Sequence, residues 1–160
     1  MSIWAALAGG FVGTVVLTTV LRAANEWKLT RTDLPFLLGT VVTDDRTRAK
    51  AIGYVAHFFF GQLFALPYYA TFAAIGYASW WLGAGFGFLH GLVAVTAVVN
   101  ILLPLVHPRM GTPFTSAPDV ALIEPPGFLM INYGVSTPVL VIAGHMAYGA
   151  IIGGFVGLAG

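Results

Sequence analysis

The sequence predicts an all-α membrane protein whose four transmembrane helices form an up-down bundle with both termini outside. Its 160 residues are 58% hydrophobic and 8% charged, whereas soluble domains carry about 25% charged residues. The chain contains four apolar runs, and each is long enough for the roughly 20 residues that a membrane span requires. Because four spans nearly fill the chain, we expect residues 1–160 to form a single domain.

The first two spans are predicted at residues 3–21 and 49–77. A signal peptide has positive residues before its apolar segment, but here they follow the first run, beginning at Arg22. We therefore expect this run to be a retained span. Asp44 and Asp45 precede the second run, where carboxylates accept hydrogen bonds from the free backbone donors of a helix start.

The last two spans are predicted at residues 80–106 and 138–158. Ser136 and Thr137 precede Pro138, a pattern typical of an N-cap followed by a first-turn proline. The loop at residues 107–132 is rich in proline, which indicates irregular structure. In the first loop, residues 33–39 combine a cap-like aspartate, a proline and an apolar stretch that ends in glycine, and they predict a short helix on the inner membrane surface.

The positive charges predict the orientation of the bundle. Six of the seven Lys and Arg residues lie between the first two spans: Arg22, Lys28, Arg31, Arg46, Arg48 and Lys50. Cytoplasmic loops carry an excess of such residues. We therefore expect this loop and the loop at 107–132 to be cytoplasmic.

Composition also argues against several classes of function. A net charge of +1 gives no sign of nucleic-acid binding, and the absence of cysteine removes disulfides, iron–sulfur clusters and thiolate zinc sites. No Asp, Glu, Lys or Arg lies deep inside a predicted span. This argues against ion-coupled transport, pumping and voltage sensing, which usually place ionisable residues at membrane depth.

Small residues four positions apart occur on three predicted spans, and in lipid such rows let helix backbones approach closely. We expect these faces to pack against other helices, of this chain or of another. The rows are Ala5, Gly9 and Gly13; Gly83, Gly87 and Gly91; and Gly149, Gly153 and Gly157.

Three histidines lie within the spans and could carry chemistry. At a rise of about 1.5 Å per residue, His57 and His145 lie about 10 Å above the cytoplasmic surface, on helices that are diagonal in an up-down bundle. They are predicted to face each other and to be able to bind haem b or a transition metal. Gly61, Gly144 and Gly149 would leave room for a flat macrocycle. His90 lies higher and is a further candidate cofactor ligand.

His107, at the cytoplasmic end of the third span, is a further candidate metal ligand that Asp119 and Glu124 could approach. The alternative for each intramembrane histidine is a neutral ring hydrogen-bonded to a neighbouring helix. Possible partners are Thr14, Thr18, Gln62, Thr96 and Asn100. Tyr68 and Tyr69 are interpreted as lipid-facing or interfacial, and no catalytic residue is predicted.

Several short motifs of the chain resemble those of one family of membrane proteins. They are Gly13-Thr14, Leu37-Leu38-Gly39, His57, Gly87 with His90, His107-Pro108-Arg109-Met110, Pro126-Gly127-Phe128, and Gly144-His145 with Tyr148-Gly149. In these the chain resembles a family of small, uncharacterised four-helix membrane proteins of prokaryotes. The resemblance implies a location in the cytoplasmic membrane and a four-helix architecture, and it implies no activity.

The functional prediction follows from these features. We expect a small non-catalytic subunit or accessory protein that packs through its glycine-rich faces, as a homo-oligomer or with other subunits of a respiratory or oxidase-type complex. The alternative is a b-type haem or metal-binding electron-transfer protein that uses the histidine pair. A transporter or channel is a third class, and it would require water-accessible polar residues lining a pore.

Overall fold

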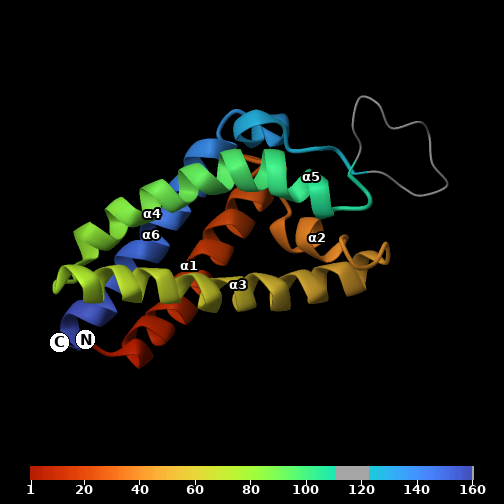
Figure 1. Ribbon diagram of the computed structural model, residues 1–160. Coiled ribbons are helices and arrows are strands. Elements are labelled where there is room, and N and C mark those ends of the chain that lie inside the picture. The colour runs from red at the N-terminus through yellow and green to blue at the C-terminus, as the bar shows by residue number, and fades with distance from the viewer. Residues whose placement is uncertain (111–122, 160) are drawn as a thin grey trace.

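The computed structural model describes residues 1–110 and 123–159 of the chain, which form helices and no β-strand (Figure 1). Four helical stretches are long and apolar enough to cross a membrane. This confirms the predicted four-span, all-α architecture. The elements are α1 (Ile3–Glu26), α2 (Leu34–Gly39), α3 (Arg46–Ile75), α4 (Trp80–Val93), the π-helical segment η1 (Ala94–Leu102), α5 (Leu103–Val106), the 3₁₀ segment η2 (Phe128–Tyr133) and α6 (Thr137–Leu158).

The span boundaries agree closely with the sequence. Elements α4, η1 and α5 together form the third span, Trp80–Val106, as predicted. Helix α1 continues to Glu26, past the predicted end at residue 21. Helix α3 begins three residues before the predicted start, at Arg46, and the side chain of Asp45 accepts a hydrogen bond of 2.7 Å from Arg48 N. The predicted cap is therefore present.

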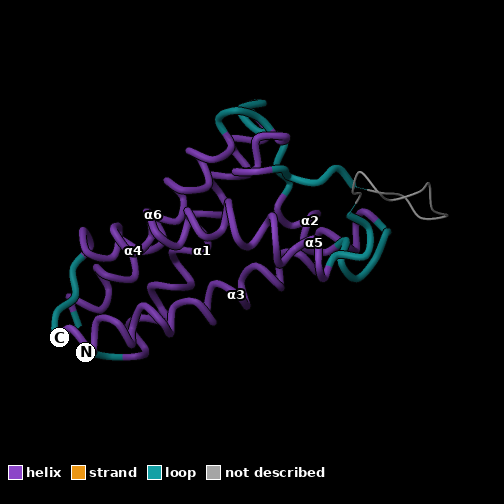
Figure 2. The backbone as a smooth tube through the Cα atoms, turned by 45° about the horizontal axis from the view of Figure 1, so that its top comes forward, coloured by secondary structure: helices purple, strands orange, loops and turns teal. Residues whose placement is uncertain are grey.

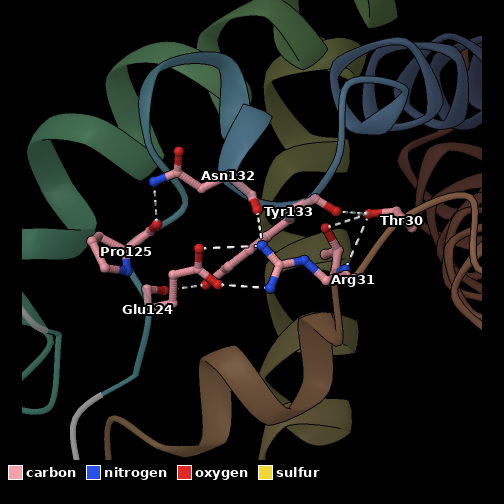
Figure 3. Close-up of polar contacts among 7 residues, drawn as sticks. Thr30, Arg31, Glu124, Pro125, Asn132 and Tyr133 are labelled. Atoms are coloured by element: carbon pink, nitrogen blue, oxygen red, sulfur yellow. Dashed lines mark hydrogen bonds and ion pairs between the residues drawn. The ribbon is translucent and has the colours of Figure 1, made fainter.

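The two termini lie at the same end of the bundle (Figure 1). At the opposite end, α2 and its flanking residues lie beside residues 123–136, as an up-down order requires. Figure 3 shows the contacts that join these loops. Arg31 N donates to the Tyr133 carbonyl at 2.6 Å, and the Arg31 guanidinium forms an ion pair of 3.0 Å with Glu124. The Tyr133 hydroxyl donates to the Glu124 carbonyl at 2.6 Å.

Helix α6 lies at the centre and packs along α1 and α4. In its most apolar stretch of 18 residues, 39% of the residues are buried, against 22% in the corresponding stretch of α3. Glycine permits these contacts: a Cβ atom added to Gly9 would lie 2.9 Å from Ile152 Cα, and one added to Gly87 would lie 2.7 Å from Met146 Cα. These glycine rows therefore pack within the chain.

Helix α3 is arranged differently. It follows α4 only near their connecting turn and then diverges from it toward the loop end, as Figure 1 and the rotated view of Figure 2 show. Large rings bridge the two helices, with centroid separations of 5.7 Å for Phe72 and Phe86 and 6.4 Å for Tyr68 and Phe86. The interface between α3 and α4 consequently consists of side chains, not of backbones in contact.

Helix α2 packs on the first turns of α3. A Cβ atom at Gly39 would overlap the Ala49 backbone, and one at Gly53 would overlap the backbone of Pro35. The Asp33 side chain accepts a hydrogen bond of 3.2 Å from Phe36 N and so begins the helix. The short helix predicted in the first loop is present, and it lies directly against α3.

Candidate functional site

The intramembrane polar residues gather around His90 on α4 and His145 on α6. Their ring centroids are 4.7 Å apart, with the planes inclined at 70°. The His90 ring also lies 4.7 Å from the ring of Phe64 and 6.1 Å from that of Tyr148. Four aromatic or imidazole rings from α3, α4 and α6 thus form one cluster near the middle of the spans.

The partners of His145 define its protonation. Its Nδ1 lies 2.8 Å from the carbonyl oxygen of Val141, one turn earlier in α6. A carbonyl can only accept, so we assign the proton to Nδ1. In this neutral tautomer Nε2 carries a lone pair.

His57 is held by α1. The Thr18 hydroxyl donates to the Thr14 carbonyl at 2.6 Å, and its oxygen lies 3.0 Å from His57 Nδ1. Because the hydroxyl proton is already engaged, His57 Nδ1 donates to Thr18. The ring is buried, with 9% of its surface exposed. This is the hydrogen-bonded neutral histidine that the sequence offered as an alternative, with Thr18 as the partner.

Two tyrosines complete the polar contacts of α3. The Tyr148 hydroxyl on α6 donates to the carbonyl of Gly61, and the Tyr68 hydroxyl lies 3.3 Å from His90 Nδ1 on α4. Together with the contact between Thr18 and His57, these bonds connect α3 to each of the other three spans. Side chains that hydrogen-bond across helices hold membrane bundles together.

The structure revises the predicted pairing. Among the described residues, the histidine ring in contact with His145 belongs to His90, whereas His57 bonds to Thr18. The prediction placed α3 and α6 diagonally around a common centre. In the structure α6 packs along α4, its neighbour in an up-down order, and much less against α3. The difference is one of depth, because His90 and His145, which were placed at different depths, are in contact.

The contacting pair does not fit a haem between its rings. Two axial imidazoles each form a bond of about 2 Å to the iron, which separates their ring centroids by roughly 6 Å. The space beside the glycines is also filled, because a Cβ at Gly61 would meet Thr14 and one at Gly144 would meet Leu17. The expectation that these glycines leave room for a macrocycle is therefore wrong.

His107 lies outside the spans, at the end of α5, and joins it to α2. Its Nδ1 accepts a hydrogen bond of 3.2 Å from Arg109 N, and its Nε2 lies 3.1 Å from the Leu37 carbonyl. Burial, and then the charge of Arg109, lower the pKa of His107, while the bond to Leu37 opposes them. Both ring nitrogens are used locally, so metal binding would require breaking these bonds.

The other groups predicted around the histidines have different roles. Glu124 pairs with Arg31, not with His107, and Asp119 lies outside the described residues. Thr96 and Asn100 bond to carbonyls of their own helix, at 2.6 Å and 2.9 Å. Within residues 1–110 and 123–159, no group of three or more His, Cys, Asp or Glu side chains is placed to hold a metal ion.

Sequence reasoning missed the two tyrosines. Tyr68 is 7% exposed and Tyr148 2% exposed, so the interpretation of Tyr68 as a lipid-facing residue is wrong. The sequence did contain a pattern that places Tyr148 in the site. It lies three residues after His145, and residues three apart lie on the same side of a helix. Tyr68 likewise follows Gly61 and Ala65 on the buried face of α3.

A comparison of the chain with protein-family models, curated proteins and solved structures finds no match. The resemblance to a family of small four-helix membrane proteins therefore stays a prediction.

Proposed function

We propose that this integral membrane protein is a small accessory subunit of a larger membrane assembly, such as a respiratory or oxidase-type complex, in which its intramembrane histidines and tyrosines act as links between helices. The observation that supports this role is the set of three hydrogen bonds from α3. They join His57 to Thr18, His90 to Tyr68 and Tyr148 to the Gly61 carbonyl. Each histidine or tyrosine is thereby used to position a helix.

The glycine rows refine this proposal. Gly83 and Gly149 face each other between α4 and α6, where a Cβ on either residue would overlap the other's carbonyl. These faces are occupied within the chain, so a partner subunit or a second copy would have to contact other parts of the surface.

Purification from its native membrane in a mild detergent tests the proposal. We expect the chain to elute in gel filtration as part of a larger particle that contains a second membrane protein or further copies. A particle that contains one chain alone, before and after chemical cross-linking in the membrane, contradicts the proposal.

Substitutions at His57 test the role of the links. In His57→Asn the side-chain amide takes the place of Nδ1 and can still donate to Thr18, whereas His57→Ala removes the donor. We expect Asn to preserve the assembled particle and Ala to weaken it. Equal behaviour of the two variants contradicts a linking role for the ring.

A second function is favoured by one specific contact, that between His90 and His145. The two rings touch, and Nε2 of His145 carries a lone pair, so the pair could supply two imidazole ligands to a transition metal for electron transfer. Metal analysis and an absorption spectrum of the purified protein test this alternative. Stoichiometric metal that is lost in His145→Ala supports it, and metal-free protein excludes it.

A further inference from the structure

A cavity of about 360 Å³ with both polar and apolar lining lies at the loop end of the bundle, between α1, α2 and α3. Its lining comes from the last turns of α1, from α2 and the residues just before it, and from the first turns of α3, which lie near one another at this end of the bundle (Figure 1). Thr18 and Leu21 contribute to its lining from α1, and Lys50 and Tyr54 from α3. Cavities of roughly 300–1,000 Å³ are typical of small-molecule sites.

The position of the cavity matches the level of lipid headgroups. It lies beside the last turns of α1 and the first turns of α3, both of which are membrane spans. Trp27, which immediately follows α1, is 74% exposed. Exposed tryptophan is enriched at the interface between hydrocarbon and headgroups, so the adjacent cavity faces the part of the bilayer that contains phosphates and amines.

The lining carries both signs of charge. Arg22 forms an ion pair of 3.0 Å with Glu26, and Lys50 forms one of 2.7 Å with Asp33. Two cations and two carboxylates therefore border one cavity, with a formal sum of zero. Each pair presents a donor for a phosphate oxygen next to an acceptor for an ammonium group.

These ion pairs are open to exchange with a ligand. The side chains of Arg22 and Glu26 are 68% and 62% exposed, and those of Lys50 and Asp33 are 41% and 30% exposed. Exposed pairs contribute little to stability, so breaking them to contact a ligand costs little. Below the charges, Leu21, Leu34 and Pro35 supply an apolar wall.

From this arrangement we propose that the cavity binds a phospholipid whose headgroup contains a phosphate and a primary amine. The phosphate lies between Arg22 and Lys50, the amine is accepted by Glu26 and Asp33, and the glycerol region follows the apolar wall. A primary ammonium has three N–H donors for the carboxylates, whereas a quaternary ammonium has none. An anionic headgroup without an amine would leave both carboxylates without a ligand partner.

Native mass spectrometry of the full chain, released from nanodiscs, measures this preference. The probes are phosphatidylethanolamine, phosphatidylcholine and phosphatidylglycerol with identical acyl chains. We expect phosphatidylethanolamine to be retained about three- to tenfold more than either of the others. Equal retention of all three lipids overturns the proposal, as does a preference for phosphatidylglycerol, which would indicate a general attraction to the positive loop.

Charge-neutralising variants locate the binding. Lys50→Gln and Glu26→Gln each remove one contact to the headgroup and should lower the preference for phosphatidylethanolamine about three- to tenfold. The matched control is Arg48→Gln, which removes an exposed cation of the same helix that does not line the cavity. An equal effect of Arg48→Gln and Lys50→Gln overturns the assignment to this cavity.

Labelling of single cysteines provides a measurement that does not depend on charge variants. The chain has no native cysteine, so Tyr54→Cys places one thiol in the cavity and Thr47→Cys places one on the exposed surface of α3. We expect phosphatidylethanolamine to slow maleimide labelling at position 54 about fivefold relative to phosphatidylcholine, with no change at position 47. Unchanged labelling at position 54 in folded protein contradicts the proposal.

Discussion

Two parts of this bundle are held together by different means. Helix α6 approaches both α1 and α4 through glycines, so that backbones and small side chains are in direct contact. Helix α3 also meets α1 closely at Gly10 and Gly61. It is connected to the other spans by long side chains as well, in the bonds of His57, Tyr68 and Tyr148. Toward the loop end, a cavity with both polar and apolar lining lies between α1, α2 and α3.

This difference explains where polar residues are placed. Close contact between glycine rows is favoured by van der Waals interactions. A ring fits there only beside a glycine, as Tyr148 does on Gly13 and His145 on Gly91. A diverging helix requires larger side chains to reach its neighbours, and polar ones supply directed bonds. The bonds that cross between helices thus lie where α3 meets the other spans, whereas His145 bonds within α6 and touches His90 of α4.

The largest effect is expected from a substitution in the glycine interface. Gly87→Val adds side-chain atoms where a Cβ alone would lie 2.7 Å from Met146 Cα, so α4 must separate from α6. We expect a loss of about 3 kcal/mol in the free energy of unfolding, or no folded protein, as measured by denaturant unfolding in detergent.

The matched control lies two residues away on the same helix. A Cβ at Gly85 meets nothing within 4 Å, so Gly85→Val should fold with little change in stability. If Gly85→Val is as damaging as Gly87→Val, then helix propensity dominates, and the close approach of α4 and α6 is not the cause.

Each hydrogen bond that links α3 to another span is expected to contribute less to the free energy of unfolding than the glycine interface does. Tyr148→Phe removes the hydroxyl that donates to the Gly61 carbonyl and leaves that buried acceptor without this partner. We expect a loss of about 1–2 kcal/mol in the free energy of unfolding. Tyr69→Phe is the control, since no hydrogen bond is found for its hydroxyl among the described residues. If Tyr148→Phe lowers the free energy of unfolding no more than Tyr69→Phe does, the bond of Tyr148 to Gly61 does not help to hold α3 against α6.

The sequence alone was sufficient to predict the four spans and a helix cap. Hydropathy and capping are local properties, so the span Trp80–Val106 and the cap at Asp45 followed directly from them. The contact of His90 with His145 did not follow, because counting residues from the span ends placed the two rings at different depths, and the packing of α4 against α6 sets their actual heights. The glycine rows predicted close packing but could not show that the packing lies within the chain.

A smaller, pH-dependent effect is expected at the junction of α5 and α2. Burial and Arg109 lower the pKa of His107 below its usual value of about 6.5, so the unfolded chain binds this proton more readily than the folded chain. The bond from Arg109 N to His107 Nδ1 requires the neutral ring, so its contribution is complete above about pH 6.5, and stability falls as the pH decreases below that value toward the lowered pKa.

The variant His107→Gln separates this effect from the titration of the other histidines. Its amide can still donate to the Leu37 carbonyl and does not titrate in this range. Unfolding of both proteins between pH 7.5 and 5, at intervals of about half a unit, should show a steeper loss for the unsubstituted protein. Parallel curves would show that His107 does not contribute to the pH dependence.

The smallest effect is expected where the two long loops meet. The ion pair of Arg31 with Glu124 is exposed, with 66% and 47% of the side chains accessible, and exposed pairs contribute about 0–1 kcal/mol. Glu124→Gln should therefore lower the free energy of unfolding by less than about 0.5 kcal/mol at low salt, and the difference should vanish at high salt. The backbone contacts of Arg31 N and the Tyr133 hydroxyl remain in this variant. A larger loss that persists in salt would show that this charge pair, and not the backbone contacts, holds the two loops together.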